Sequence, residues 1–234
     1  MPKRLTSTRT SRRSDLAAIL RELERKGSKQ YFADMSARYG IVTKAKAYGV
    51  PVATLRAMAN SLGRDHDLAE ALWASGVHDA RMLATMVGDP ARLTPAQMSR
   101  WAKDFDNWGI VDTACFGYFD QSPDAFKQIE KWAKAKDEFV KRAAFALLAS
   151  VALHRKELGD EPFLKCMSVV EAGAADGRNF VKKGVSWALR AIGKRKSARL
   201  KAAALAVAER LANAEDAPSR WVGKDALRDL AGRT

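Results

Sequence analysis

The feature that most constrains the fold is a succession of short segments with helical periodicity, each closed by a breaker. Good helix formers dominate, and no segment alternates apolar and polar residues over the length of a strand. Glycine and proline separate the segments, as at Gly88-Asp89-Pro90. At Thr94-Pro95 and Ser122-Pro123, an N-capping side chain precedes a proline suited to the first helical position. The sequence therefore predicts an all-α fold with helices at 14–26, 29–39, 52–62, 66–75, 78–87, 95–104, 108–119, 123–134, 137–154, 160–173, 178–193, 197–212 and 217–230.

Short helices joined by short loops favour stacking in pairs, because each pair can bury its apolar faces only against its neighbours. Sequence similarity between the pairs is weak, so this interpretation depends on the number and spacing of the helices. We predict a HEAT-like helical repeat solenoid (an α-α superhelix) with a basic face, forming one domain over residues 14–234. The segment 137–154 is apolar almost all round and should be central.

The charge balance points to an anionic partner. The chain has 41 Lys and Arg against 27 Asp and Glu, a formal net charge of +14, and such an excess repels itself unless it meets nucleic acid, an acidic membrane surface or an acidic protein. Five of these cations lie in the acid-free segment 1–13. This segment is interpreted either as a flexible tail that adds non-specific DNA affinity or as an organelle transit peptide. The body is basic in either case.

Membrane insertion and secretion are not expected. No apolar run approaches the roughly 20 residues that a membrane helix needs, and no basic segment followed by an apolar one suggests a secretory signal. We expect a cytoplasmic monomer that is nucleoid-associated when bound to DNA.

No metal or cofactor is expected either. Cys115 and Cys166 are too far apart for a zinc motif and too few for a disulfide framework, so both are interpreted as buried apolar residues. His66, His78 and His154 are scattered without metal-ligand spacing. The sequence also lacks a Gly-rich phosphate loop and a nucleophile elbow.

The segment 178–193 has a clear division of faces. At 100° per residue, Val181, Val185, Ala188 and Ile192 form a core stripe. The opposite side carries Lys183, Trp187, Arg190 and Lys194. The ring of Trp187 either packs against the next repeat beneath lysine stems or belongs to a nucleic-acid surface. The remaining tryptophans, at 73, 101, 132 and 221, are interpreted as core or inter-repeat packing.

A second candidate group lies in the segment 108–119. Trp108 and Asp112 are four residues apart and share one face of the predicted helix, and Asp106 is placed to cap it. The carboxylate of Asp112 is either paired with a cation or available for chemistry. Arg142, in the central helix, suits a phosphate or Asp112 itself, or bridges two repeats. Small residues beneath it, at 146 and 149, would leave room for something to approach.

In this order, these residues resemble the DNA alkylation repair glycosylases of the AlkD type. The resemblance spans nearly the whole chain, and the combination of motifs is far more specific than any one of them. The motifs that carry it are Tyr48-Gly49-Val50-Pro51, Gly76-Val77-His78-Asp79-Ala80-Arg81, Asn107-Trp108 to Asp112, Phe139-Val140-Lys141-Arg142-Ala143, and Asn179-Phe180-Val181-Lys182-Lys183 to Trp187.

The resemblance implies a HEAT-like solenoid with a concave DNA-binding surface. It also implies a DNA glycosylase of base excision repair whose substrate is double-stranded DNA with alkylated purines. It implies release of cationic N3- and N7-alkylated purines without a deep base pocket. It also implies that Trp108 and Trp187 face the sugar, that Asp112 is the catalytic carboxylate, and that Arg142 lies near the DNA backbone. The further basic residues predicted to bind DNA are Lys141, Lys182, Lys183, Arg190 and Lys194.

One departure from the family pattern is Gly109, where many relatives carry a second carboxylate directly after the motif tryptophan. Glycine weakens the helix start and removes a charge. Since non-catalytic relatives share the fold, two alternatives stand beside the glycosylase: a DNA-binding protein without chemistry that recognises unusual or branched DNA, and a protein scaffold with an acidic partner.

Overall fold

The computed structural model describes residues 5–232, and the prediction of an all-α fold is confirmed. Within those residues the β-structure is a single isolated parallel bridge between Lys46 and Val77. The chain forms two compact units, residues 1–92 and 93–234, which are described separately. The prediction of one domain over 14–234 stays a prediction.

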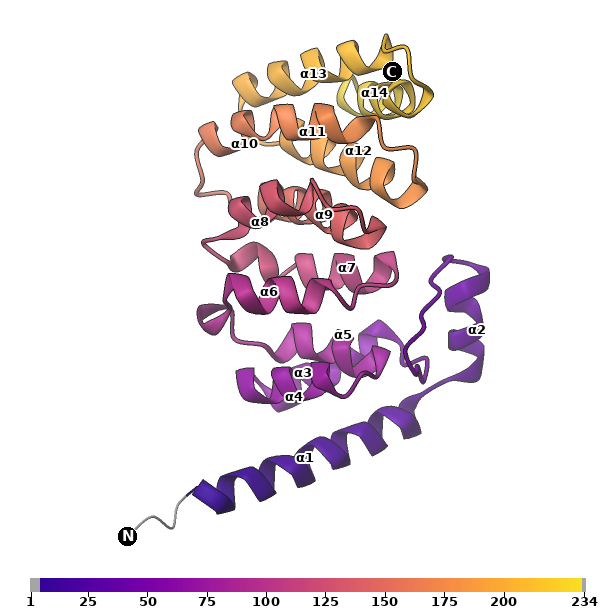
Figure 1. The fold of residues 1–234 in the computed structure, drawn as a ribbon, viewed down its shortest axis with the longest axis vertical. Helices are drawn as coiled ribbons and strands as arrows, with labels where there is room; N and C mark the ends of the chain where they lie inside the picture. The colour runs from indigo at the N-terminus through magenta and orange to yellow at the C-terminus, as the bar shows by residue number, and fades with distance from the viewer. Residues whose placement is uncertain (1–4, 233–234) are drawn as a thin grey trace. The chain divides into compact units, whose positions relative to one another are not determined.

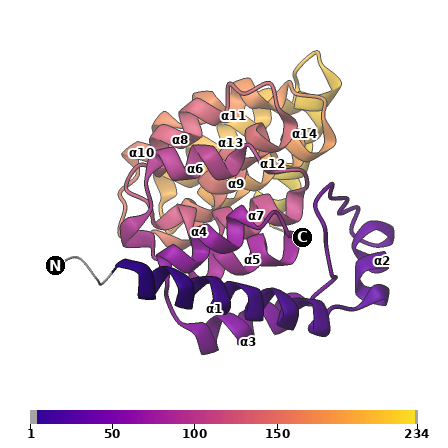
Figure 2. The same cartoon turned by 60° about the horizontal axis from the view of Figure 1, so that its bottom comes forward.

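The first unit contains five α-helices and a short 3-10 helix in its described part. Figure 2 shows α1 running alongside this group, where it contacts α4 and α5. The carboxylate of Asp79 accepts the backbone N–H groups of Tyr48 (2.6 Å) and Val50 (2.8 Å), so it anchors the loop before α3 to the start of α5. The elements are α1 (Leu5–Lys26), α2 (Lys29–Ala37), α3 (Val52–Leu62), α4 (His66–Ala74), α5 (His78–Val87) and η1 (Pro90–Arg92).

The second unit is built from two layers of helices, visible as a stack in Figure 1. The first layer contains α7 (Trp108–Cys115), α9 (Glu138–His154), α12 (Asn179–Gly193) and α14 (Ala217–Leu230), each in contact with the next. The second layer contains α6 (Pro95–Ala102), α8 (Ala125–Trp132), α10 (Glu161–Lys165), α11 (Met167–Ala174) and α13 (Ala198–Ala212). The 3-10 helix η2 (Phe119–Gln121) follows α7.

The first-layer helices run in the same direction, as contacts at the two ends of α9 and α12 show. Phe139 near the start of α9 lies beside Phe180 near the start of α12, with ring centroids 5.5 Å apart. Beyond the other end of α12, Arg195 donates to the carbonyl of Ala152 near the end of α9. The N-terminal turns of these helices therefore lie along one edge of the layer.

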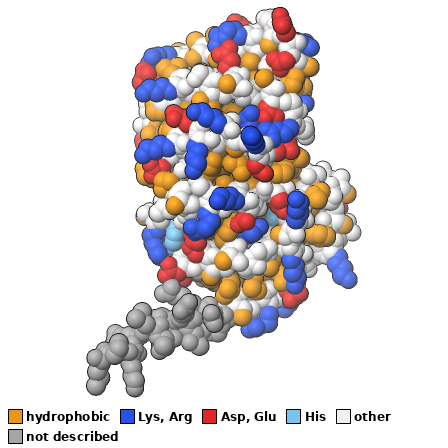
Figure 3. All heavy atoms as spheres, viewed as in Figure 1, with side chains coloured by type: hydrophobic (Ala, Val, Ile, Leu, Met, Phe, Trp, Pro, Cys, Tyr) orange, Lys and Arg blue, Asp and Glu red, His pale blue; other side chains and the backbone are white. Residues whose placement is uncertain are grey.

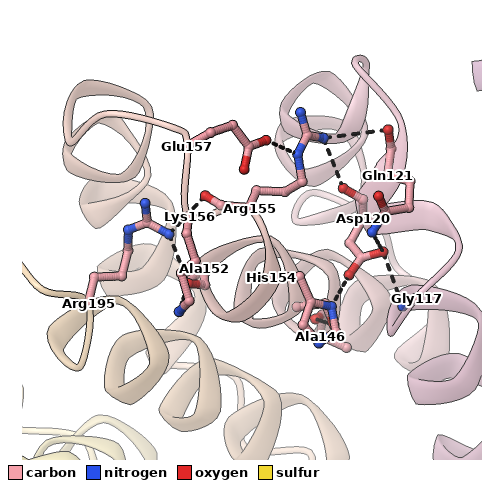
Figure 4. Close-up of polar contacts among 11 residues, drawn as sticks. Gly117, Asp120, Gln121, Ala146, Ala152, His154, Arg155, Lys156, Glu157 and Arg195 are labelled. Atoms are coloured by element: carbon pink, nitrogen blue, oxygen red, sulfur yellow. Dashed lines mark hydrogen bonds and ion pairs between the residues drawn. The ribbon is translucent and has the colours of Figure 1, made fainter.

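Helix α9 is central, as its sequence predicted, and residues 142–152 are all buried. Figure 4 shows how its C-terminal end is held. His154 contacts the fully buried carboxylate of Asp120 in η2, and Arg155 donates to the carbonyl oxygens of Asp120 and Gln121. Arg195 donates to the carbonyl of Ala152 in the last turn of α9, to that of the C-cap Arg155, and to that of Leu158 in the loop that follows. The helix is thus tied to its neighbours on both sides.

Two predicted helices of the second unit differ from the observed ones. The segment 108–119 is helical only to Cys115, because Phe116 adopts an extended conformation and Gly117 has a φ of +98°, a region that favours glycine. The segment 160–173 divides at Cys166, whose N–H bonds the Phe163 carbonyl three residues back in a tighter 3-10-type turn.

The basic segment 1–13 lies partly outside the described residues, which begin at position 5. From Leu5 onward the backbone belongs to α1, so the helix begins nine residues earlier than the predicted start at 14. No helix in the described part of the chain is long and apolar enough to cross a membrane.

Most predicted core residues are buried, and Trp221 is the exception. Cys115 and Cys166 are free and buried, as expected, and Trp73, Trp101 and Trp132 are at most 4% exposed. Trp221 is 37% exposed, so the first of its two alternatives, the core, is excluded; its ring lies against Lys182 of α12, which leaves packing between repeats. It precedes Val222, which occupies the buried face of α14, and the helical twist therefore turns the indole away from the core.

Gly223 fixes how closely α14 packs on α13. A Cβ atom there would lie 2.2 Å from the Ala212 nitrogen and 2.6 Å from the Ala208 carbonyl oxygen, both backbone atoms. We expect Gly223→Ala to lower the free energy of unfolding by about 1–3 kcal/mol, because the helices must separate. Urea denaturation measures this, with Gly159→Ala as the control because no atom lies within 4 Å of a Cβ there. Equal stability of the two variants would contradict the tight crossing.

Candidate functional site

The helix that carries Asp112 begins with a different cap from the predicted one. The side chain of Asn107 accepts the N–H of Ile110 at 3.1 Å and thereby caps α7. Asp106, which we expected to cap the helix, accepts the side-chain amide of Asn107 at 2.8 Å instead. The two residues together fix the start of α7, where Trp108 is the first helical residue.

The guanidinium of Arg142 joins three helices of the first layer. Its Nε donates to Asp112 Oδ1 at 3.0 Å and its Nη2 to Asp112 Oδ2 at 2.7 Å. Its Nη1 donates to the carbonyl of Phe180 at 2.8 Å. Arg142 is 6% exposed, while the Asp112 side chain is 23% exposed. Of the alternatives for Arg142, the pairing with Asp112 and the bridge between repeats are both present.

Opposing effects act on the pKa of Asp112. Burial raises this pKa above its ordinary value of 3.8, and the charge and hydrogen bonds of Arg142 oppose the rise. Burial therefore disfavours the ionised form of Asp112, and Arg142 is the group that favours it. The same carboxylate, with Asp120, adds to the burial that raises the pKa of the Cys115 thiol well above its ordinary value.

The two predicted sugar-facing rings lie on helices that flank α9. Trp108 lies one turn before Asp112 on α7, and Trp187 lies two turns after Phe180 on α12; both are half-buried. The predicted division of α12 is confirmed, since its core stripe is buried and Trp187 lies outside it. The space expected beneath Arg142 is not open, because Ala146 and Ala149 are fully buried.

Lys141 belongs to a compact ion-pair cluster between α9 and the loop before α12. Its Nζ lies 2.9 Å from Asp176 Oδ2, and Arg178 contacts the same carboxylate at 2.6 Å. Hydrogen bonds from Arg178, and more weakly from Lys141, hold the pKa of Asp176 well below its usual range although burial opposes them. The predicted DNA contact by Lys141 would have to compete with this carboxylate.

Arg190 and Lys194 meet carboxylates on α14 that the sequence reasoning missed. Arg190 lies 3.7 Å from both Asp225 and Asp229, and Lys194 lies 2.6 Å from Asp229. Lys194 in particular lowers the pKa of Asp229. The two acids are four residues apart, and Trp221 is four residues before Asp225, so their spacing already indicated one shared face of α14.

Lys182 and Lys183 differ from the other cations of α12. The Lys182 Nζ lies 5.0 Å from the ring centroid of Trp221, and Lys183 is exposed. Among the side chains that the structure describes, no carboxylate lies within ion-pair distance of either lysine. On the face seen in Figure 3, cationic and anionic side chains are interspersed rather than gathered into one patch.

The fold of the chain is that of HEAT-like repeat proteins related to DNA glycosylases. A solved structure with a TM-score of 0.72 and 18% sequence identity covers 91% of this chain and 94% of its own. It is described as representing a new family of proteins related to the HEAT-like repeat DNA glycosylases with affinity for branched DNA structures. The predicted HEAT-like class is confirmed, and the concavity of a basic face stays a prediction.

The family follows from the sequence itself. Residues 13–230 match the family described as DNA alkylation repair enzyme, and the chain belongs to that family. A comparison with curated proteins finds no match. The predicted membership of a DNA alkylation repair family is confirmed, while the roles assigned to individual residues stay predictions.

Arg142 should be a stability determinant beyond any role at the site. Replacing it by glutamine leaves Asp112 without its cation, so we expect Arg142→Gln to lower the free energy of unfolding by about 3 kcal/mol. Adding Asp112→Asn should recover part of that loss in a double-mutant cycle measured by urea denaturation.

The control for this cycle is Arg199→Gln, which breaks the exposed pair of Arg199 with Glu161. That change should cost less than about 1 kcal/mol because exposed pairs contribute little. A cost for Arg142→Gln no greater than for the control would contradict the role assigned to the buried pair.

Proposed function

We propose that the chain is a monomeric DNA glycosylase that releases cationic N3- or N7-alkylated purines from duplex DNA without a metal, a cofactor or a deep base pocket. The observation that carries the proposal is Asp112, a partly exposed carboxylate held in place by Arg142. It lies one turn from the half-buried Trp108 on the same helix. Membership in the DNA alkylation repair enzyme family supports the choice of substrate.

The chemistry requires little acid catalysis. An alkylated N3 or N7 purine is already cationic, so its bond to C1′ breaks with both electrons moving to the base, which leaves neutral. The sugar then carries positive charge until a water oxygen bonds to C1′ and releases a proton. A carboxylate stabilises the first species by its charge and accepts the proton in the second step.

Asp112 fits both tasks. Its oxygens bind Arg142 with defined geometry, and each oxygen keeps a second lone pair for a water or for the charged sugar. The rings of Trp108 and Trp187 would add cation–π attraction to a sugar that gains positive charge. Arg142 then acts through Asp112, as a positioning residue, and its contact with the DNA backbone stays a prediction.

The decisive experiment compares base release by wild type and by Asp112→Asn on duplex DNA containing 7-methylguanine. We expect the variant to be slower by about 10²- to 10⁴-fold, since the amide neither carries charge nor accepts a proton. Asp124→Asn removes a carboxylate in the loop before α8 and is the matched control, with unchanged release expected. Wild-type release no faster than spontaneous loss would overturn the enzymatic proposal.

The pH profile of the same reaction identifies the titrating group. Because burial raises the pKa of Asp112, its active ionised form is lost as the pH falls, at a higher pH than for an ordinary aspartate of pKa 3.8. Removing the opposing charge in Arg142→Gln should move this acidic limb to still higher pH. If the rate of the wild-type enzyme fell only at or below pH 3.8, Asp112 would be excluded as the group whose protonation causes the fall.

A DNA-binding protein without chemistry is the second candidate. It is favoured by the pairing that already neutralises Asp112, by Gly109 in place of a second carboxylate, and by the affinity of the structural relative for branched DNA. It predicts salt-sensitive DNA binding together with no release of 7-methylguanine.

Lys183 provides a test of DNA binding that does not depend on catalysis. Removing one lysine that binds a phosphate should reduce the slope of log affinity against log salt by about 0.9. We expect Lys183→Gln to show this reduction on duplex DNA. Lys201→Gln, an exposed lysine of α13 in the second layer, is the matched control and should leave the slope unchanged. Equal slopes for the two variants would exclude Lys183 from the interface.

A further inference from the structure

We propose that Trp221 is a stacking site for an unpaired base of the bound DNA, with Lys182 beside it to meet the adjacent phosphate. The inference rests on the proposed DNA binding and adds a contact separate from Asp112. The ring of Trp221 has no part in the proposed base release, and an unpaired base is the ligand that we infer for it.

The indole of Trp221 is exposed at the surface, unlike three other tryptophan rings of the chain. Trp221 is 37% exposed, whereas Trp73, Trp101 and Trp132 are at most 4% exposed. A flat indole at the surface offers a π-face to any of the four bases, and base–aromatic stacking is tolerant of sequence.

The position of Trp221 along its helix is set by packing. Gly223, two residues later, faces the α13 backbone so closely that a Cβ atom there would lie 2.2 Å from the Ala212 nitrogen, so this face of α14 must be the one that meets α13. The side chain of Ser186 then donates to Asp225 at 2.6 Å, which sets the register between α12 and α14. Trp221, one turn before Asp225, is therefore held beside Lys182, one turn before Ser186.

The charge along this seam changes from one end to the other. Toward the C-terminal end, Arg190 and Lys194 are paired with Asp225 and Asp229. At the N-terminal end, the described side chains place no carboxylate within ion-pair distance of Lys182, whose Nζ lies 5.0 Å from the indole centroid. An anionic strand therefore meets a lysine that lacks a carboxylate partner among the described side chains at the end where the ring is exposed, and that contact attracts it.

A base still paired and stacked in a duplex has both faces covered. The ring of Trp221 can stack only on a base that has left the helix or has no partner, and this requirement selects an extrahelical or single-stranded nucleotide over a paired one. Lys182 contributes to affinity by binding the phosphate. This contribution is the same for a nucleotide that has its base and for an abasic one, because both keep the phosphate.

The test uses three undamaged DNA probes: a fully paired duplex, the same duplex with one extrahelical base, and the same duplex with an extrahelical abasic nucleotide. Affinities are measured by fluorescence anisotropy at one salt concentration. Wild type should bind the extrahelical base roughly 5- to 150-fold more tightly than the abasic probe, the range found for a stacked base. This comparison needs no variant.

Variants then assign the preference to the ring. Trp221→Ala should bind these two probes equally, and Trp221→Phe should keep most of the preference because it keeps an aromatic face. Lys182→Gln should weaken binding to all three probes by a similar factor and keep the preference. Lys224→Ala, an exposed residue one turn away on α14, is the matched control and should behave as wild type.

The proposal is overturned if wild type binds the base and abasic probes equally, or if Trp221→Ala retains the preference. A protein that shows the preference but releases no alkylated base would refute the glycosylase proposal alone, so the two failures are distinguishable.

Discussion

The buried guanidinium of Arg142 is the interaction on which the second unit depends. It is 6% exposed, and its three nitrogen atoms donate to Asp112 of α7 and to the Phe180 carbonyl of α12. A buried arginine is tolerated only where its donors are satisfied, so the relative positions of α7, α9 and α12 are constrained by one side chain. The opposite end of α9 is fixed by His154, Arg155 and Arg195 (Figure 4). A candidate carboxylate is thereby placed on a rigid frame.

Much of the positive charge in the composition is already paired with carboxylates in the folded chain. A net charge of +14 describes the whole chain, but several predicted DNA-binding cations are paired within it: Lys141 with Asp176, and Lys194 with Asp229. A phosphate would have to displace a carboxylate at those positions and would gain less than at an unpaired lysine. Lys182 and Lys183, for which the described side chains place no carboxylate within ion-pair distance, lie toward the N-terminal end of α12. The attraction for DNA should therefore be strongest at that edge of the layer.

The sequence was sufficient for much of the fold because helix starts and breakers are local signals. The bounds 52–62, 78–87 and 217–230 match the observed helices, and the core stripe of α12 followed from spacing alone. The pairing of Arg142 with Asp112 was among the alternatives that the residues allowed. The partners of Arg190 were not foreseen, because they depend on the register of α12 against α14, which no local pattern specifies. Trp221 was different: its position beside Val222 already placed it off the core face, which left packing between repeats as the alternative.

The pairing of Asp112 bears on both candidate functions in opposite ways. The two hydrogen bonds from Arg142 occupy a lone pair on each oxygen of Asp112 and offset its charge, which favours binding without chemistry. However, the proposed reaction has a leaving group that is already charged, so its demand is for a fixed negative charge near C1′ rather than for a strong base. Burial alone would favour the neutral acid, which offers no such charge, and Arg142 counteracts that effect. An arginine that opposes the effect of burial on a largely covered aspartate is therefore compatible with stabilising a cationic sugar, and it is the fixed geometry of the pair, more than its basicity, that this chemistry requires.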